Sequence, residues 1–139
     1  QRALERSDKV EVETLLTSEG LSNNQVLSIL QDREGNIWVG TFNGLHRFSP
    51  SNVVQHPVNC SPGTLVAGDA GELWIGCKGV AQVSLSREGK IVRRHDSPVF
   101  SAAHRDVGGT VWFAGERVLA HVENDRLVMR PLPPSPLNH

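Results

Sequence analysis

The amino-acid sequence predicts an all-β protein, built from about three four-stranded antiparallel blades of a β-propeller. Three observations favour this fold class: a recurring motif, short strand-forming runs, and strands that are apolar on both faces. The motif appears as DREGNIWVG, DAGELWIG and DVGGTVWFAG, and these copies contain the chain's three tryptophans, Trp38, Trp74 and Trp112. The tryptophans are 36 and 38 residues apart, a spacing typical of repeat architectures.

Each repeat contains four short runs rich in β-branched residues, separated by Gly, Asn, Asp or Pro. No segment keeps apolar residues at helical spacing, so at most a turn or two of helix is expected, as at Leu15–Gly20. The predicted strands are Val26–Gln31, Asn36–Gly40, Leu45–Phe48 and Val53–His56 in the first unit; Thr64–Ala67, Glu72–Cys77, Val80–Leu85 and Lys90–Arg94 in the second; and Val99–Arg105, Thr110–Ala114, Val118–Val122 and Arg126–Arg130 in the third.

The motif begins with a turn between the first two strands of a unit. In the first unit the Asp32 side chain can accept hydrogen bonds from backbone amides of the turn, and Gly35 can take the positive φ that closes it. Gly71 and Gly109 hold the same place before their tryptophans, and Asp106 matches Asp32. The second unit departs from this pattern, because Gly68 stands where the aspartate belongs and an aspartate follows one residue later.

The strand after the turn is apolar without alternation, as in Ile37-Trp38-Val39 and Leu73-Trp74-Ile75. Successive side chains of a strand point to opposite faces, so both faces must be buried. With no helices to cover them, the sheets must cover one another, which is the arrangement of a propeller. A glycine or alanine two residues after each tryptophan suits a close approach of neighbouring sheets. A β-solenoid does not require four hairpin-linked strands in each repeat. A sandwich would leave one face of each sheet in water, and its strands would then alternate apolar and polar residues.

The predicted organisation follows the repeats. Residues 1–19 hold one stray strand of a preceding blade, at Lys9 to Thr14, and a connector; residues 20–57, 58–96 and 97–130 are the three blades; and residues 131–139 are a proline-rich tail or the start of a next blade. Closed propellers need roughly four to eight blades. The chain is therefore expected to be part of a longer propeller, and its copies are expected to associate to complete the ring.

Composition excludes several functions for this segment. The net charge is −1 and no basic stripe is present, so nucleic acid is not an expected partner. No run approaches the ~18 consecutive apolar residues of a membrane helix. Cys60 and Cys77 can form a disulfide if their strands meet, or remain two free thiols, and both alternatives stay open.

The stretch GLSNNQVLSILQDREGNIWVGTFNGLHRFSP resembles the two-component regulator propeller repeat. The residues in register with that repeat are Gly20, Leu21, Val26, Ile29, Asp32, Gly35, Trp38, Gly40, Thr41, Gly44, Leu45 and Phe48. The second unit keeps Gly71, Trp74, Gly76 and Gly79, and the third keeps Asp106, Gly109 and Trp112. Cys77 replaces the threonine of the second unit and Ala114 the glycine of the third, which weakens any claim that all three units do one specific job.

The resemblance implies a non-catalytic sensor segment of a bacterial signalling receptor, such as a hybrid two-component kinase or a diguanylate cyclase. It also implies a periplasmic location, with the membrane reached only through segments outside these residues. The alternative is a structural propeller for protein–protein assembly without a small ligand. A propeller enzyme, such as a lyase or a glycosidase, is not favoured because no acidic cluster suited to that chemistry is present.

One loop is a candidate for ligand binding. Ser22, Asn23, Asn24 and Gln25 precede the innermost strand of the first unit, and such loops line one end of a propeller's channel. A small molecule or glycan is the expected ligand, against the simpler interpretation of a polar connector. The tryptophans are expected to be core residues rather than a stacking platform for sugars.

No metal or cofactor is expected. The aspartate turns lack the dense oxygen ligands of a calcium loop, and none of the six histidines has paired zinc-ligand spacing. Among the histidines, His46 and His121 occupy similar places on third strands.

Overall fold

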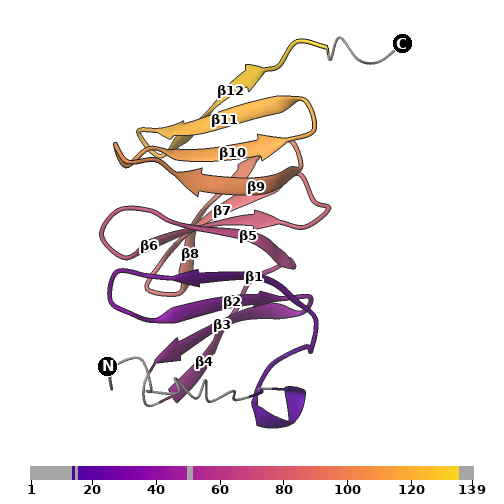
Figure 1. Ribbon diagram of the computed structural model, residues 1–139, viewed down its shortest axis with the longest axis vertical. Helices are drawn as coiled ribbons and strands as arrows, with labels where there is room; N and C mark the ends of the chain where they lie inside the picture. Colours follow the sequence, from indigo (N-terminus) through magenta and orange to yellow (C-terminus); the bar gives the residue numbers. More distant parts are fainter. Residues whose placement is uncertain (1–13, 15, 50–51, 135–139) are drawn as a thin grey trace, which may run out of the picture.

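The structure, a computed structural model, describes residues 14, 16–49 and 52–134. These residues form three four-stranded antiparallel sheets stacked one above another (Figure 1), which confirms the predicted fold class. In each sheet, consecutive strands are neighbours. Sheet 1 contains β1 (Val26–Gln31), β2 (Ile37–Thr41), β3 (Gly44–Ser49) and β4 (Asn52–His56); sheet 2 contains β5 (Pro62–Ala67), β6 (Glu72–Cys77), β7 (Gln82–Arg87) and β8 (Lys90–Asp96); sheet 3 contains β9 (Phe100–Arg105), β10 (Val111–Gly115), β11 (Val118–Glu123) and β12 (Arg126–Pro131).

A single 3₁₀ turn, η2 (Thr17–Glu19), precedes sheet 1 within the described residues, close to the short helical segment that the sequence allows. The predicted strand at Lys9 to Thr14 falls outside the described residues except for Thr14. In the described part of the chain, no helix is long and apolar enough to cross a membrane.

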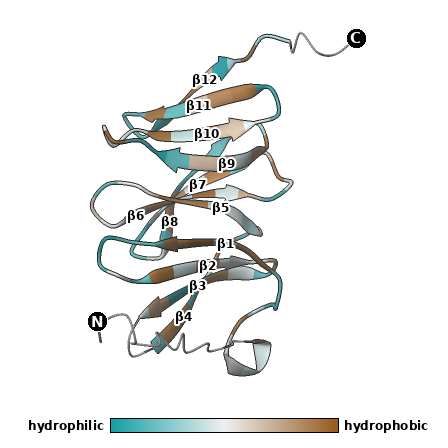
Figure 2. Cartoon of the chain, in the orientation of Figure 1, coloured by the Kyte–Doolittle hydropathy of each residue, from teal (hydrophilic) through white to brown (hydrophobic). Residues whose placement is uncertain are grey.

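The middle sheet is buried on both faces, as the non-alternating strands predict. Two neighbouring residues of β6 show this most directly: Ile75 packs in a cluster with sheet 1, and Trp74 packs in a cluster with sheet 3. Burying an aromatic side chain of ~150–250 Å² is worth about 4–6 kcal/mol at ~25 cal/mol per Å². The two sides of β6 therefore join three sheets into one stack. Figure 2 shows the hydrophobic residues concentrated on the strands and hydrophilic residues at several turns.

The cluster between sheets 1 and 2 is built around Trp38 and Leu45 from sheet 1 and Ile75 from sheet 2. The cluster between sheets 2 and 3 is built around Trp74 from sheet 2 and Phe113 from sheet 3. The first strands of the sheets lie beside one another, because β5 contacts both β1 and β9. Three sheets that fan from adjacent first strands are successive blades of a propeller.

Sheet 3 departs from the expectation that all three tryptophans are core residues. Trp38 and Trp74 are buried, whereas Trp112 is only partly buried. Its neighbour Phe113 points toward sheet 2 and is fully buried, so Trp112 points to the opposite face. In the part of the chain that the structure describes, no further sheet covers that face, and this is why Trp112 keeps some exposure.

The glycine two residues after the first tryptophan permits a close approach of sheets, as expected. A Cβ atom on Gly40 would lie 2.3 Å from the carbonyl oxygen of Pro62, the first residue of sheet 2. At Gly76 the nearest atoms belong instead to Thr64, which lies on the adjacent strand of the same sheet. The equivalent residue of sheet 3 is Ala114, on the uncovered face, where a side chain meets no neighbouring blade.

Candidate functional site

The predicted binding loop is held down by its own polar side chains. The Ser22 hydroxyl lies 2.7 Å from that of Thr41 on β2. The Asn23 side chain accepts a hydrogen bond from the backbone N–H of Gln25 at 2.7 Å, and the Asn24 side chain accepts one from the backbone N–H of Thr17 at 2.8 Å. Three of the four predicted side chains therefore serve the conformation of the loop, and only Gln25 presents its side chain to solvent without such a bond.

A buried histidine anchors the same loop to sheet 1. The backbone N–H of Ser22 donates to Nε2 of His46 at 3.1 Å, and His46 on β3 is fully buried. Because Nε2 is the acceptor, the neutral ring carries its proton on Nδ1. Burial lowers the pKa of His46 below its ordinary value, which keeps the ring in this neutral state.

A hollow near the first strands of the three sheets is not lined by the predicted loop. Its volume is about 290 Å³, and Leu27 of β1, Thr64 of β5 and Ser101 of β9 contribute to its walls. None of the residues Ser22 to Gln25 is among its lining residues. Ligand binding by the loop thus stays a prediction.

The repeat aspartates make a bond that the sequence did not reveal. Asp32 accepts the backbone N–H of Asn36 at 2.8 Å, as the turn pattern predicts, and its second oxygen accepts the indole N–H of Trp38 at 2.9 Å. Asp106 repeats both bonds, with the backbone N–H of Thr110 at 2.9 Å and the Trp112 indole N–H at 2.9 Å. The aspartate therefore orders the turn and fixes the tryptophan ring six residues later.

These bonds shift the aspartate pKa values downward. Burial raises the pKa of Asp32, but the hydrogen bonds from Trp38 and Asn36 outweigh it and hold this pKa below the ordinary value. At Asp106 the hydrogen bond from Trp112 is the main cause of the lowered pKa. The three turn glycines, Gly35, Gly71 and Gly109, have φ values of 85°, 79° and 89°, which confirms their predicted conformation.

Three described histidines, His56, His95 and His121, pack against the tryptophans of their own sheets. Among the described residues, no group of three His, Cys, Asp or Glu side chains could hold a metal ion. His46 and His121 both lie on third strands, but on opposite faces of their sheets, because His46 pairs with Val39 and His121 pairs with Trp112.

The equivalent histidines are instead His56 and His95, on the fourth strands of sheets 1 and 2. His56 packs against Trp38 with ring centroids 5.3 Å apart, and His95 stacks on Trp74 at 5.8 Å. Burial is the main cause of the lowered pKa of both histidines, and Arg47 beside His56 and Arg93 beside His95 add to it. The sequence signal was a histidine at or next to the end of the fourth strand, which the third unit lacks.

A disulfide joins the two cysteines whose state the sequence left open. Cys60, in the connection between sheets 1 and 2, is bonded to Cys77 at the end of β6, with Cα atoms 5.6 Å apart. The backbone N–H of Lys78 donates to the carbonyl of Ser61 next to this bridge at 2.8 Å. The bridge therefore ties the inter-blade connection to the second strand of sheet 2.

Comparison with known proteins identifies the repeat. The profile of the two-component regulator propeller family matches residues 20–43. This segment holds the loop, β1, the aspartate turn and β2. No curated protein matches the sequence.

Solved structures with the same fold include two kinds of propeller. A streptogramin B lyase has a TM-score of 0.70 and 17% identity, over 83% of this chain and 43% of the lyase. The extracellular domain of a protein described as a hybrid two-component system of B. thetaiotaomicron has a TM-score of 0.66 and 24% identity, over 86% of this chain and 18% of that domain. A second structure of the same protein's extracellular domain, there described as a one-component system, has a TM-score of 0.64 and 25% identity, over 81% of this chain and 17% of that chain.

The chain spans less than half of each of these structures, all of which are β-propeller proteins. The aspartate turn and the tryptophan strand fall within the family match. The chain therefore consists of three β-propeller blades and carries, at residues 20–43, a repeat of the two-component regulator propeller family.

Proposed function

We propose that this chain is a segment of the propeller sensor domain of a bacterial signal-transduction receptor, and that it binds or relays a signal without catalysing a reaction. The observation that carries the proposal is the family repeat at residues 20–43, placed in a fold shared with extracellular domains of two-component systems. The fold by itself favours no function, because propellers host both receptors and lyases. The repeat, rather than the fold, favours the receptor.

The disulfide supports a location outside the cytoplasm. Disulfides persist in oxidising compartments and are rare in the cytosol. The bond between Cys60 and Cys77 therefore agrees with the extracellular domains that share this fold. We propose the periplasm as that compartment.

The proposal is tested on the full-length receptor to which this segment belongs. Transcriptional or kinase output is measured as candidate ligands are added, and addition of one ligand is expected to change the output. A variant in which Ser22, Asn23, Asn24 and Gln25 are all alanine tests the loop in the same assay. A weaker response to the ligand at equal receptor abundance would support ligand binding by the loop. An unchanged response would show that the loop is not part of the binding surface.

The lyase alternative is separated by a direct assay. The purified chain and the full-length protein are incubated with a streptogramin B antibiotic, and loss of the intact antibiotic is followed by liquid chromatography. An unchanged antibiotic is the expected result. Conversion that depends on the protein would replace the sensor proposal with an enzymatic one.

A second candidate function, self-assembly, is favoured by the uncovered faces of the outer sheets. On sheet 3, partly exposed Trp112 and Leu119 lie on the face that points away from sheet 2. On the opposite end of the stack, Ile29 of sheet 1 is 68% exposed and Val53 is 41% exposed. The inner interfaces already pair a tryptophan face of one sheet with an apolar face of the next.

We propose that a second copy of the chain occupies these faces, with sheet 3 of one copy on sheet 1 of the other. Such head-to-tail contacts can close into a ring. Sedimentation velocity over a range of protein concentrations is expected to show association. Leu119→Glu should shift the chain to monomer, whereas Val92→Glu, at an exposed apolar residue of β8, should not. A well-folded monomer at all concentrations would reject self-assembly.

A further inference from the structure

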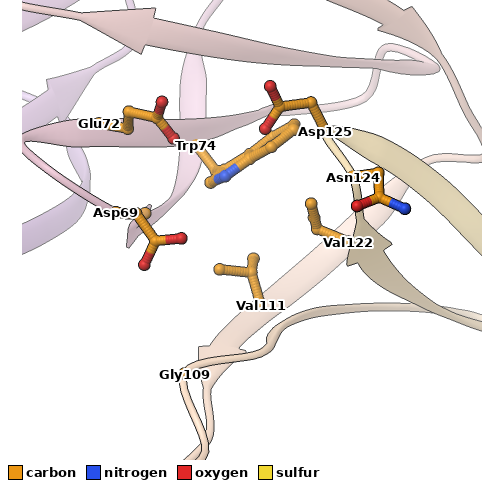
Figure 3. A pocket seen from close by; sticks show the side chains of 9 residues that line it. Asp69, Glu72, Trp74, Gly109, Val111, Val122, Asn124 and Asp125 are labelled. Atoms are coloured by element: carbon orange, nitrogen blue, oxygen red, sulfur yellow. The ribbon is translucent and has the colours of Figure 1, made fainter.

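A cleft of about 250 Å³ lies between sheets 2 and 3, on the side of the aspartate turns. Its walls come from the turn before β6, the turn before β10 and the turn between β11 and β12. Figure 3 shows Asp69, Glu72 and Asp125 around this cleft, with the Trp74 ring between them. The cleft is separate from the predicted loop, which lies before β1.

The cleft exists because the middle blade lacks the repeat aspartate. In sheets 1 and 3 the aspartate side chain accepts the indole N–H of its tryptophan at 2.9 Å. In sheet 2 the corresponding residue is Gly68, whose backbone still closes the turn through its N–H bond to the Glu72 carbonyl at 2.9 Å. The turn is therefore conserved in shape across the three blades, and only the acceptor for the indole is missing.

The Trp74 indole N–H is consequently unpartnered. The Trp74 residue is 2% exposed and no hydrogen bond joins its indole nitrogen to another described residue, but this nitrogen is not among the fully buried polar atoms without a partner, so it reaches the surface of the cleft. Figure 3 shows this nitrogen directed into the space between Asp69 and Val111. A donor that faces the cleft and has no acceptor within the chain is available to an oxygen atom of a bound molecule.

Charge balance favours a neutral ligand. Three carboxylates surround the cleft, and each one is paired with an arginine. The pairs are Arg87 with Glu72 at 2.7 Å, Arg105 with Asp69 at 2.6 Å, and Arg93 with Asp125 at 3.8 Å. Three positive and three negative groups cancel, so neither a free cation nor a free anion gains much at this site.

Hydrogen-bonding chemistry narrows the ligand class further. The indole N–H can only donate, whereas the carboxylate oxygens can only accept, and Asn124 can do both. A ligand hydroxyl group both accepts and donates, so several hydroxyl groups on one small molecule satisfy the indole, the carboxylates and the amide together. The apolar walls at Val111 and Val122 suit the carbon skeleton of such a molecule.

We propose that the cleft between sheets 2 and 3 binds a small neutral ligand rich in hydroxyl groups, such as a single sugar ring or a polyol, with the Trp74 indole N–H donating to one of its oxygens. This inference rests on the proposed sensing function and names a ligand class and a site for it. The loop at Ser22 to Gln25 takes no part in it.

Indole N–H resonances of the ¹⁵N-labelled 139-residue chain test the inference, because the three tryptophans give one signal each. Glucose, galactose and myo-inositol serve as probes, with glucosamine and glucuronate as charged counterparts. A neutral probe is expected to shift the Trp74 signal in a saturable manner and to leave the Trp38 signal unmoved, since Trp38 is already bonded to Asp32.

Two substitutions should remove the site by different routes. Gly68→Asp supplies the acceptor that the other blades have, and its Cβ would lie 3.1 Å from the Trp74 indole nitrogen. Trp74→Phe removes the donor. Isothermal titration calorimetry with the same neutral probes measures both variants, because Trp74→Phe has no Trp74 signal. Each is expected to weaken binding by up to about tenfold, the loss that one hydrogen bond produces. Gly108→Asp makes the same chemical change in the next turn, outside the cleft lining, and should bind as the wild type does.

Several results would overturn the inference: a Trp74 signal that moves no more than those of Trp38 and Trp112, undiminished binding to a folded Gly68→Asp chain, or binding of charged probes alone. Failure here is distinguishable from failure of the sensor proposal. A full-length receptor that responds to ligand without a Trp74 shift keeps the function and loses this site. A saturable Trp74 shift in a receptor without ligand-dependent output keeps the site and loses the function.

Discussion

The aspartate of the repeat links a turn to the ring that fills the next interface. Asp32 receives bonds from the Asn36 backbone and the Trp38 indole, and Trp38 in turn packs against residues of sheet 2. The sequence predicted the turn bond, because an aspartate side chain at the start of a turn accepts hydrogen bonds from the backbone amides of that turn. It could not predict the indole bond, since that bond depends on the ring orientation that sheet 2 imposes.

Replacing Asp32 with alanine should lower the free energy of unfolding by about 1–3 kcal/mol, since it leaves the buried Trp38 indole N–H without an acceptor. Urea unfolding followed by tryptophan fluorescence measures this loss. Asp106→Ala is the matched control, with a smaller effect expected because its partner Trp112 is partly exposed and can bond water. Equal losses for the two variants would contradict this account of the indole bond.

At the scale of elements, the sequence predicted the type and order of the twelve strands in the described residues, while the strand predicted at Lys9 to Thr14 is untested. Turn glycines and β-branched runs mark most strand ends, so the observed bounds lie within two residues of the predicted ones. The largest shift is at β7, predicted at Val80–Leu85 and observed at Gln82–Arg87. There the turn extends through Val80, whose carbonyl accepts the Gln82 N–H at 2.8 Å, so two residues of strand character belong to the loop.

The cleft between sheets 2 and 3 could be predicted only in part. The sequence shows that Gly68 stands in place of the repeat aspartate. The consequence for Trp74 depends on how the side chains of sheet 3 pack against it, since Arg105 of the next blade donates to the Gly68 carbonyl and, like the indole N–H, offers no acceptor. Such contacts between blades have no local signature in the sequence.

The disulfide should stabilise the connection between sheets 1 and 2. It closes a loop with a sequence separation of 17 residues, and chain-entropy arguments give about 3 kcal/mol for a loop near this length. Unfolding of the Cys60→Ser, Cys77→Ser double variant by urea should show a loss of this size. Addition of dithiothreitol to the wild type should give the same loss, and its addition to the double variant should give none. An unchanged midpoint after verified reduction would show that the connection is held by its other contacts.

At the scale of the whole molecule, three histidines make stability depend on pH. The pKa values of His46, His56 and His95 are all lowered in the folded chain, mainly by burial. Unfolded histidines titrate near ~6.5, so stability is fully present above that pH. As the pH falls below ~6.5, the unfolded chain binds protons on these histidines while the folded chain does not, so the free energy of unfolding decreases. The decrease ends once the pH is below the lowered pKa values of the folded chain.

The free energy of unfolding should therefore fall between about pH 7.5 and 5.5, by up to ~1.4 kcal/mol per pH unit for each excess proton. The lowered pKa values of Asp32 and Asp106 act only at more acidic pH, below ~4. Urea titrations at several pH values measure the slope. His46→Gln, which keeps an acceptor for the Ser22 N–H, should reduce the slope, and His104→Gln, at an exposed side chain, should not. A flat profile over this range would contradict the burial argument.

The two apolar clusters share no residue, and sheet 2 alone belongs to both. Any energetic coupling between sheet 1 and sheet 3 must then be transmitted through sheet 2. A double-mutant cycle between Leu45→Ala and Phe113→Ala should give a coupling energy below ~0.5 kcal/mol, while one between Trp74→Ala and Phe113→Ala, whose rings meet edge to face at 6.3 Å, should exceed it. Substitutions in the cluster at one end of the stack should therefore have little effect on the packing energy of the cluster at the other end.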